Sequence, residues 1–154
     1  MDLNTKLSPH FKLKELIRSD KAIKLGIDNT PPAEVISSLA RICVSILEPV
    51  QSHFLVPFSV NSGYRCPDLN KALGGSKNSQ HMLGQAVDFE VPGISNFDLA
   101  YWISKNLFYD QLILENYESG KPNSGWVHVS LISGVNRMQL LTIKGSYKRQ
   151  GLIA

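Results

Sequence analysis

The sequence predicts an α+β fold in which N-terminal helices pack on a small, mainly antiparallel sheet. Two observations support this prediction: helical periodicity is concentrated in the first third of the chain, and short strand-like runs follow it. The regular alternation of strands and helices that builds a parallel sheet is absent. With 154 residues, of which 43% are hydrophobic, the chain can bury one core, so we expect a single domain over residues 1–154.

Two short helices are expected within residues 11–25, where apolar residues recur at helical spacing. Ser19 is placed to cap the second helix, because its hydroxyl can accept a hydrogen bond from a free backbone N–H group. Gly26 then ends this segment, since glycine adopts the left-handed conformation that often follows a helix.

A longer helix should start at the sequence Asn-Thr-Pro-Pro of residues 29–32. Thr30 can act as its N-cap, Pro31 fits the first helical position, and Glu34 faces the positive end of the helix dipole. Apolar residues between positions 35 and 50 form a broad stripe for packing on a sheet. Pro49 should kink or shorten the last turns of this helix.

Short strands dominate the rest of the chain. Strand-like runs are found at residues 58–62, 86–91, 109–114, 126–131 and 138–143. A helix is expected at residues 96–106, and one or two helical turns at residues 67–73. The polar, turn-forming stretch at residues 74–79 leads directly into His81.

Charge and hydropathy exclude several classes of protein. The net charge is +3, and no block of like charges indicates a nucleic-acid-binding arm or a disordered tail. Lys144, Lys148 and Arg149 could attract an anionic polymer, although a solvated surface is the simpler interpretation. No apolar run approaches the roughly 20 residues of a membrane helix. Residues 1–20 lack the apolar segment of a signal peptide, so we expect synthesis in the cytoplasm without secretory export.

The two cysteines and two of the four histidines lie outside the motifs that carry chemistry. Cys43 belongs to the apolar stripe and Cys66 precedes a proline, and their separation is no zinc-ligand spacing. We interpret both as free thiols, although sequence alone does not exclude a disulfide between them. His10 and His53 are interpreted as structural or surface residues.

The candidate metal ligands lie in two short segments. His81 and Asp88 stand seven positions apart within residues 79–88, and Gly84 between them lets the chain turn. Because side chains alternate along a strand, Asp88 points away from the apolar face formed by its two neighbours. His128 also lies between two valines, so a second strand can present it in the same way.

Two imidazoles and one carboxylate suit a single zinc ion. Three protein ligands leave the fourth tetrahedral position open for water, which is typical of a catalytic site, and the positive charge of such a site favours amide hydrolysis at neutral pH. The simpler alternative is that each histidine is a hydrogen-bonded structural residue and that Asp88 caps a turn or forms an ion pair.

Several motifs carry a resemblance to a known family. They are Ser62-Gly63-Tyr64-Arg65, Leu69-Asn70, Ser79-Gln80-His81, Gly84-Gln85-Ala86-Val87-Asp88 and Trp126-Val127-His128. In order and spacing they resemble the zinc D-alanyl-D-alanine carboxypeptidase family, which shares its fold with the hedgehog signalling domain and includes phage endolysins that cut the peptide stems of peptidoglycan. The resemblance extends from about residue 11 to residue 132 and implies a hedgehog/DD-peptidase-like fold.

The resemblance implies that His81, Asp88 and His128 are the ligands of one zinc ion and that Arg65 engages a carboxylate of the substrate. The planar guanidinium of arginine is matched to a carboxylate, although Arg65 could equally form a structural salt bridge. Ser79 could donate a hydrogen bond to the substrate or only stabilise its own turn. Trp126 is expected to pack beside the site and contact the substrate.

The general base is the least defined part of the site. Many members of the family carry a glutamate three residues before the last histidine, where this chain has Gly125. Glu115 ends a strand-like run and could reach the metal if that run lies beside the one carrying His128. Glu118 and Glu90 are weaker candidates, and an exposed glutamate without a catalytic role is the alternative for all three.

The resemblance therefore implies a zinc metallopeptidase that hydrolyses a peptide bond in peptidoglycan stem peptides, either by releasing terminal D-alanine or by cutting inside the stem. A monomeric enzyme that acts on the cell wall, of the phage lysis or tail-associated type, fits this interpretation. The alternative is a non-catalytic module on the same fold that binds cell-wall peptide or a partner protein. The missing glutamate at position 125 is the best support for that alternative.

Overall fold

A six-stranded sheet in the order β1-β2-β4-β3-β5-β6 organises the computed structural model, which describes all 154 residues. The strands are β1 (Val60–Ser62), β2 (Ala86–Phe89), β3 (Gln111–Glu115), β4 (Trp126–Ser130), β5 (Gln139–Lys144) and β6 (Tyr147–Gln150). Every pair of neighbours is antiparallel except β3 and β5, which are parallel. The predicted mainly antiparallel sheet is therefore confirmed.

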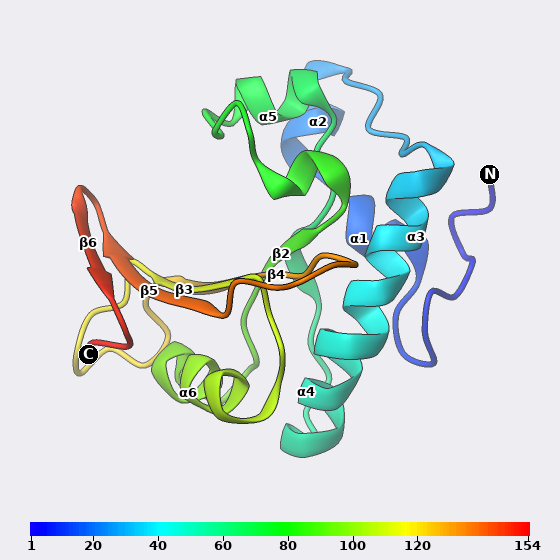
Figure 1. The fold of residues 1–154 in the computed structure, drawn as a ribbon. Coiled ribbons are helices and arrows are strands. Elements are labelled where there is room, and N and C mark those ends of the chain that lie inside the picture. Colours follow the sequence, from blue (N-terminus) through cyan, green and yellow to red (C-terminus); the bar gives the residue numbers. More distant parts are fainter.

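Helices lie on both faces of this sheet (Figure 1). They are α1 (Leu13–Ile17), α2 (Asp20–Leu25), α3 (Ala33–Ile42), the π-helical η1 (Cys43–Leu47), α4 (Glu48–Phe54), α5 (Pro67–Ala72), the 3₁₀-helical η2 (Gln80–Leu83) and α6 (Asn96–Asn106). Helix α6 covers one face, whereas η2 and α5 lie over the other, and α3, η1 and α4 form one long helix beside the sheet (Figure 1). None of the helices has the length and hydrophobicity needed to cross a bilayer.

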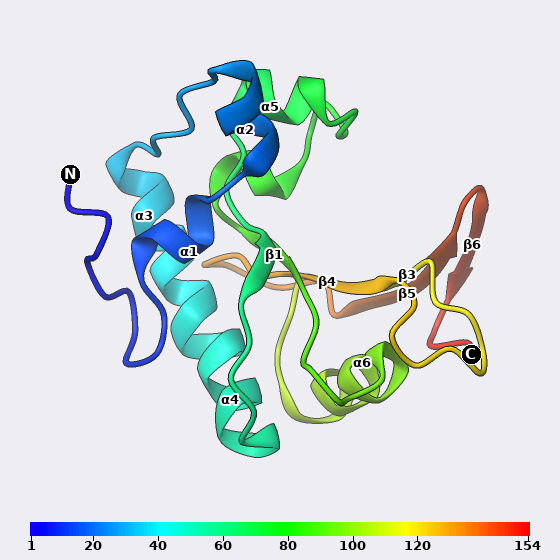
Figure 2. The same cartoon turned by 180° about the vertical axis from the view of Figure 1, so that it is seen from behind.

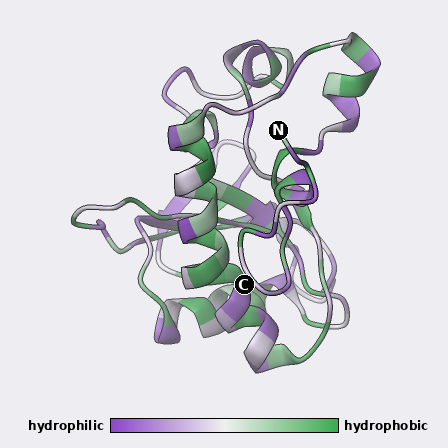
Figure 3. Cartoon of the chain, turned by 90° about the vertical axis from the view of Figure 1, so that its right-hand side faces the viewer, coloured by the Kyte–Doolittle hydropathy of each residue, from purple (hydrophilic) through white to green (hydrophobic).

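One cluster of 23 buried residues joins the long helix, α6 and the sheet. Leu112 and Leu114 of β3 and Val127 and Val129 of β4 are fully buried on the face that α6 covers. Along the long helix, hydrophobic and hydrophilic residues interleave, as expected for a helix with one buried face (Figure 3). The apolar side chains of one face thus pack in the core. The alternate residues of β2, β3 and β4 point to the opposite face of the sheet.

Local signals placed the first two helices correctly. The Ser19 hydroxyl accepts a hydrogen bond from the N–H of Ala22 at 3.2 Å and caps α2. Gly26 ends the helix with a φ of 66°, a left-handed conformation that glycine adopts without strain.

The predicted start of the long helix was wrong. Helix α3 begins at Ala33 with Pro32 as its N-cap, and Thr30 instead donates its backbone N–H to the carboxylate of Asp28 at 2.9 Å. A residue before a proline is forced out of the helical region by the proline ring. Two successive prolines therefore hold Thr30 and Pro31 extended, and the helix can begin only after Pro32.

Pro49 was predicted to kink or shorten the end of the long helix, and the structure shows a π-helical segment just before it instead. The helix is not shortened; residues 43–47 widen into a π-helix, and Pro49 falls in the first turn of α4. A proline inside a helix removes one N–H and its ring clashes with the carbonyl four residues earlier, here that of Ser45. The π turn includes Ser45, and the N–H of Glu48 bonds to Cys43, five residues back.

Strand β6 was missed by the sequence analysis. It follows β5 through a hairpin in which Lys144 pairs with Tyr147 and Gly145 has a φ of 58°. All four residues of β6 are exposed, so no apolar alternation marks it in the sequence. Lys148 and Arg149, which we interpreted as charged surface, are in fact exposed side chains of this edge strand, where charge prevents further strand pairing.

Candidate metal centre

Two adjacent strands present the first pair of candidate ligands. Asp88 of β2 stands directly opposite His128 of β4 in the antiparallel register, so both side chains leave the same face of the sheet. This face is opposite to the one that buries Val87 and Val129. The Nδ1 atom of His128 lies 2.8 Å from Oδ1 of Asp88.

The third candidate ligand, His81, lies in a short turn over this face of the sheet. His81 is the second residue of η2, which Ser79 caps by accepting a hydrogen bond from the N–H of His81 at 3.3 Å. Gly84 ends the turn with a φ of 67°, and a Cβ atom at this position would lie 2.7 Å from the carbonyl oxygen of Val35. The turn can therefore close only around glycine, and it places Nε2 of His81 3.3 Å from Oδ2 of Asp88.

The three side chains together fit a metal ion. Their ligand atoms lie within 4.8 Å of one another, and all three residues are buried or half-buried. Nδ1 of His81 lies 2.7 Å from the carbonyl oxygen of Gly63. Because a carbonyl only accepts hydrogen bonds, the hydrogen of the neutral ring sits on Nδ1, and the lone pair of Nε2 points to the centre of the group. We call His81, Asp88 and His128 the metal cluster.

The carboxylate of Asp88 is the charged centre of this cluster. Burial raises the pKa of Asp88, but the hydrogen bond from His128 and the adjacent imidazole of His81 outweigh burial and hold the pKa well below its usual range. The guanidinium of Arg65 adds a further contact, with Nη2 3.2 Å from Oδ2. Asp88 is therefore ionised at neutral pH, as a metal ligand must be.

Arg65 is held in place by three side chains. Its Nε donates to the hydroxyl of Ser62 at 3.0 Å, Nη1 to the amide oxygen of Asn70 at 3.4 Å and Nη2 to Asp88. The side chain is 15% exposed. The structure thus shows the salt bridge that the sequence left open, whereas contact between Arg65 and a substrate carboxylate stays a prediction.

Glu115 lies on the same face as the metal cluster. In the register of β3 and β4 it stands opposite Trp126, while Ile113 stands opposite His128, so Glu115 is one diagonal step from His128. Burial raises the pKa of Glu115, the charge of Asp88 raises it further, and His128 opposes this rise. No hydrogen bond or ion pair engages its carboxylate.

The two weaker candidates for the base are engaged elsewhere. Glu90 accepts hydrogen bonds from the amides of Asn61 and Asn96, and the exposed Glu118 forms an ion pair with Lys121. Among the three glutamates, only Glu115 combines a free carboxylate with a position beside His128.

The backbone explains why position 125 carries no side chain. Gly125 has a φ of 67°, and a Cβ atom there would lie 1.9 Å from the carbonyl oxygen of Glu115. Any L-residue at this position would be strained and would collide with β3. The same contact places the backbone of Glu115 directly beside Gly125, the position at which the resemblance would expect a glutamate.

A model of the Peptidase M15 family matches residues 9–130, which is more than half of the chain and includes the whole metal cluster. The chain belongs to the Peptidase M15 family. This confirms the resemblance to the zinc D-alanyl-D-alanine carboxypeptidases and the fold expected from it. No curated protein matches the chain. Members of the family are zinc-dependent metallopeptidases, and the metal cluster could hold the ion in this M15 peptidase.

Of the remaining predicted site residues, Trp126 shares a hollow with Asp88 of the metal cluster. With Ser62, Asp88 and Glu90 it lines a hollow of about 200 Å³, which we call the site hollow. Ser79 caps the turn of His81, as described above, and a contact of either residue with the substrate stays a prediction. His10 pairs with Glu48 at 2.7 Å and His53 stacks on Trp102, both outside the M15 site.

Asp110 is a supporting residue that the sequence analysis missed. Its buried carboxylate accepts hydrogen bonds from Nε2 of Gln80 at 3.0 Å and from Nη2 of Arg137 at 2.8 Å. Because Gln80 precedes His81, this carboxylate ties the turn of the metal cluster to the segment before β5. Hydrogen bonding by Arg137 holds the pKa of Asp110 below its usual range despite burial. Its partners are 30 and 27 positions away, so no local pattern reveals it.

Replacing Asp110 with alanine should lower both the melting temperature and the zinc affinity. The variant frees the turn of His81 and leaves Gln80 without its acceptor, and loss of such supporting contacts lowers metal affinity by about tenfold or more. Thermal unfolding of the metal-free protein and competition with a chelator would measure the two effects. Glu118→Ala, which breaks an exposed ion pair, is the control and should change neither. An unchanged zinc affinity in Asp110→Ala would show that the contact only stabilises the fold.

Replacing Gly125 with alanine should destabilise the protein by about 3 kcal/mol or more, because the new Cβ combines a left-handed φ with a collision against β3. Gly120→Ala is a matched control, since Gly120 has a φ of 82° but no atom within 4 Å of the added Cβ. That control should lose only about 1–2 kcal/mol. Urea unfolding would compare the two variants, and equal losses would contradict the collision.

Proposed function

We propose that this M15 peptidase hydrolyses a peptide bond in the stem peptides of peptidoglycan, either by releasing terminal D-alanine or by cutting inside the stem. The observation that carries the proposal is the convergence of His81, Asp88 and His128 on one point, with the unpaired carboxylate of Glu115 on the same face. A group that could bind a metal and a candidate base lie on this face, Asp88 also lines the site hollow, and the family supplies the class of reaction.

The proposed division of work follows from the positions of the side chains. His81, Asp88 and His128 hold one zinc ion, which when bound supplies Lewis acidity for hydrolysis of an amide. Glu115 accepts a proton from the attacking water on its carboxylate and returns it to the leaving amine. Partial burial supports this role, because the raised pKa of Glu115 brings the carboxyl group closer to neutral pH, where a general base works best.

Arg65 and Trp126 are proposed to orient the substrate. Arg65 presents its guanidinium beside Asp88, where it can stabilise negative charge on a substrate carboxylate or carbonyl oxygen. Trp126 forms a wall of the site hollow, and its indole offers a flat apolar surface to a small side chain such as that of alanine. Ser79 lies at the start of the turn over the site and is proposed to donate a hydrogen bond to the peptide.

A monomer that acts on the cell wall, as a phage-type lysis or tail-associated enzyme does, is the proposed setting. The charge of +3 suits weak attraction to an anionic wall polymer. The exposed Lys148 and Arg149 of β6 provide part of this charge, at the opposite edge of the sheet from β1.

A second candidate function is non-catalytic binding of cell-wall peptide on the same fold. One observation favours it, namely that the backbone at Gly125 leaves no room for the glutamate that many relatives carry there. A binding module should bind zinc and peptide without hydrolysing the peptide. The free carboxylate of Glu115, in contrast, supports peptidase activity.

Incubation of the zinc-loaded protein with purified stem peptides, followed by mass spectrometry of the products, tests the proposal. We expect a new amine and a new carboxylate terminus at one bond, and no product after treatment with a chelator. Restored cleavage on return of zinc would link the activity to the metal. Peptides that bind but stay intact at every metal and pH tried would reject the peptidase in favour of the binding module.

A further inference from the structure

The side chain of Asn96 is buried and contacts two segments that line the site hollow. Asn96 is the first residue of α6, and it is 1% exposed. Its Nδ2 lies 2.9 Å from Oε1 of Glu90, 3.0 Å from the carbonyl oxygen of Ser124 and 3.1 Å from that of Gly125. Glu90 directly follows β2, Gly125 directly precedes β4, and both line the site hollow. One amide group thus joins the ends of the two strands that carry Asp88 and its partner histidine.

The backbone at the start of α6 holds the same loop. Residues 116–125 connect β3 to β4, and Figure 2 shows this loop in yellow beside α6. The N–H of Asn96 donates to the carbonyl oxygen of Pro122 at 3.1 Å. The next residue, Phe97, packs its ring against that of Tyr117, with 6.0 Å between the ring centroids. The start of α6 therefore contacts the loop near both of the strands that it connects.

The hydrogen bonds of the Asn96 side chain are all on its donor side. Nδ2 carries two hydrogens and has three acceptors within reach, whereas the buried Oδ1 has no partner in the protein. Turning the amide over would place Oδ1 against three acceptors, so its orientation is fixed. A buried acceptor without a donor destabilises the fold. The amide is therefore poorly suited to stability alone, but it matches a wall formed by one carboxylate and two carbonyl groups.

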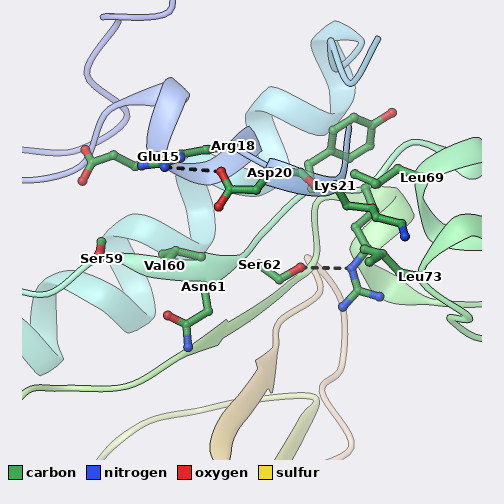
Figure 4. A pocket seen from close by; sticks show the side chains of 13 residues that line it. Glu15, Arg18, Asp20, Lys21, Ser59, Val60, Asn61, Ser62, Leu69 and Leu73 are labelled. Atoms are coloured by element: carbon green, nitrogen blue, oxygen red, sulfur yellow. Dashed lines mark hydrogen bonds and ion pairs between the residues drawn. The ribbon is translucent and has the colours of Figure 1, made fainter. Parts of the chain in front are cut away.

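A second amide holds Glu90 from β1. Nδ2 of Asn61 donates to Oε2 of Glu90 at 3.2 Å, so each carboxylate oxygen of Glu90 accepts a hydrogen bond from one amide. The side chain of Asn61 points away from Arg18 and Asp20 of the neighbouring helical segment (Figure 4). Asn61 is exposed and lines the site hollow. The carboxylate of Glu90 is thus fixed between an exposed amide of β1 and the buried amide of Asn96.

We infer that Asn96 is a positioning residue that fixes the wall of the site hollow, through Glu90 on one side and Gly125 on the other. This inference rests on the proposed function and deepens it, because it assigns the shape of the substrate opening to a residue that does not line it. Trp126 follows Gly125 directly, so a shift of the loop moves the indole that is proposed to contact the peptide. A misplacement of about 1 Å can cost about 100-fold in rate.

The metal cluster should not depend on this amide. Asp88 and His128 lie in the paired parts of β2 and β4, where the backbone register holds them opposite each other. His81 is placed by its own turn, which Asp110 supports through Gln80. Loss of the Asn96 amide should therefore weaken peptide binding and leave zinc binding unchanged. Asp110→Ala, in contrast, is expected to lower zinc affinity.

Asn96→Ala tests the inference, with Asn106→Ala as the matched control. Asn106 is an exposed asparagine of the same helix, and its amide donates to Trp102 within that helix. With the stem pentapeptide as the probe, we expect KM to rise at least about fivefold in Asn96→Ala and kcat to change less than about twofold. Zinc affinity should stay constant, and the control should match the wild type in all three quantities.

Stability is measured separately by urea unfolding of each variant. A lower stability with unchanged KM would make Asn96 a purely structural residue, and a loss of zinc affinity in parallel with KM would assign it to the metal cluster. Either result overturns the inference. Asn96→Ser retains one hydroxyl donor and replaces Asn96→Ala if the latter does not fold. In Asn96→Ser, KM should rise less but still at least about twofold.

Nuclear magnetic resonance of the indole groups reports on the wall directly. The chain has two tryptophans, so Trp102→Phe assigns the signal of Trp126. In the zinc-loaded Asn96→Ala protein without peptide, the Trp126 signal should shift or broaden. In Asn106→Ala it should keep its wild-type position. An unchanged Trp126 signal in folded Asn96→Ala would contradict the inference whatever the value of KM.

Failure of the proposed function would look different from failure of this inference. If the wild-type protein binds the pentapeptide without cleaving it, the peptidase is rejected, and the dissociation constant from calorimetry takes the place of KM. A rise of that constant by at least about fivefold in Asn96→Ala would then uphold the inference. If the wild-type protein and Asn96→Ala cleave the pentapeptide with equal KM, the peptidase stands and the role of Asn96 is rejected. A wild-type protein that neither binds nor cleaves the pentapeptide would overturn both.

Discussion

Replacing Glu115 with glutamine should reduce turnover by about 10²–10⁴-fold and leave zinc binding unchanged. Glutamine keeps the size of the side chain but cannot accept a proton at neutral pH. Glu115 stands opposite Trp126 and contributes no contact to Asp88, so the metal cluster should remain intact. Steady-state rates with stem peptide and the zinc content of the purified variant would measure the two effects, with kcat falling and KM nearly constant.

Glu118→Gln is the matched control for that experiment. Glu118 is a glutamate of the following loop, and it is paired with Lys121 at the surface. It should retain full activity. Near-normal turnover in Glu115→Gln would exclude Glu115 as the base, and a loss of zinc from this variant would show that the residue supports the metal instead.

Removing either imidazole of the metal cluster should eliminate zinc binding at micromolar concentrations and, with it, all turnover. In His81→Ala or His128→Ala only two ligands remain, and Asp88 keeps Arg65 and one histidine as its neighbours. Loss of a direct ligand should weaken binding by more than the roughly 100-fold that loss of a supporting contact causes. Metal analysis after dialysis against zinc of known concentration would show this directly.

His10→Ala provides the control, because His10 is an exposed histidine paired with Glu48 and far from the site in the fold. It should retain one zinc ion per chain. Circular dichroism of the metal-free proteins would establish that each variant is folded. Full zinc occupancy in His81→Ala would mean that the ion is bound elsewhere, and this result would contradict the proposed function.

Local sequence predicted several elements closely, and its errors have physical causes. Helix α6 has the predicted bounds, because the hydroxyl of Ser95 caps it and its apolar residues repeat at helical spacing. The start of α3 was misplaced since capping by Thr30 requires a backbone that Pro31 forbids. Strand β6 was missed because an exposed edge strand has no buried face and hence no apolar alternation.

The candidate site was only partly predictable for a related reason. The spacing of His81 and Asp88 across Gly84 and the position of His128 between two valines are short-range features, and the sequence contains them in full. The roles of Arg65 and Glu115 depend on distant partners. Whether Arg65 faces Asp88, 23 positions away, and whether Glu115 lies beside His128 follow from strand pairing and not from neighbours in the chain.

The sequence by itself determined the identities of the candidate ligands, the glycine turn over the site and the alternation that separates its apolar and polar faces, because turn chemistry and side-chain direction depend on a few adjacent residues. Tertiary structure alone decided that Asp88 meets His128, that Asp110 holds the turn of His81 and that Arg65 reaches Asp88. These contacts join segments far apart in sequence, and their formation depends on the packing of the whole sheet against its helices.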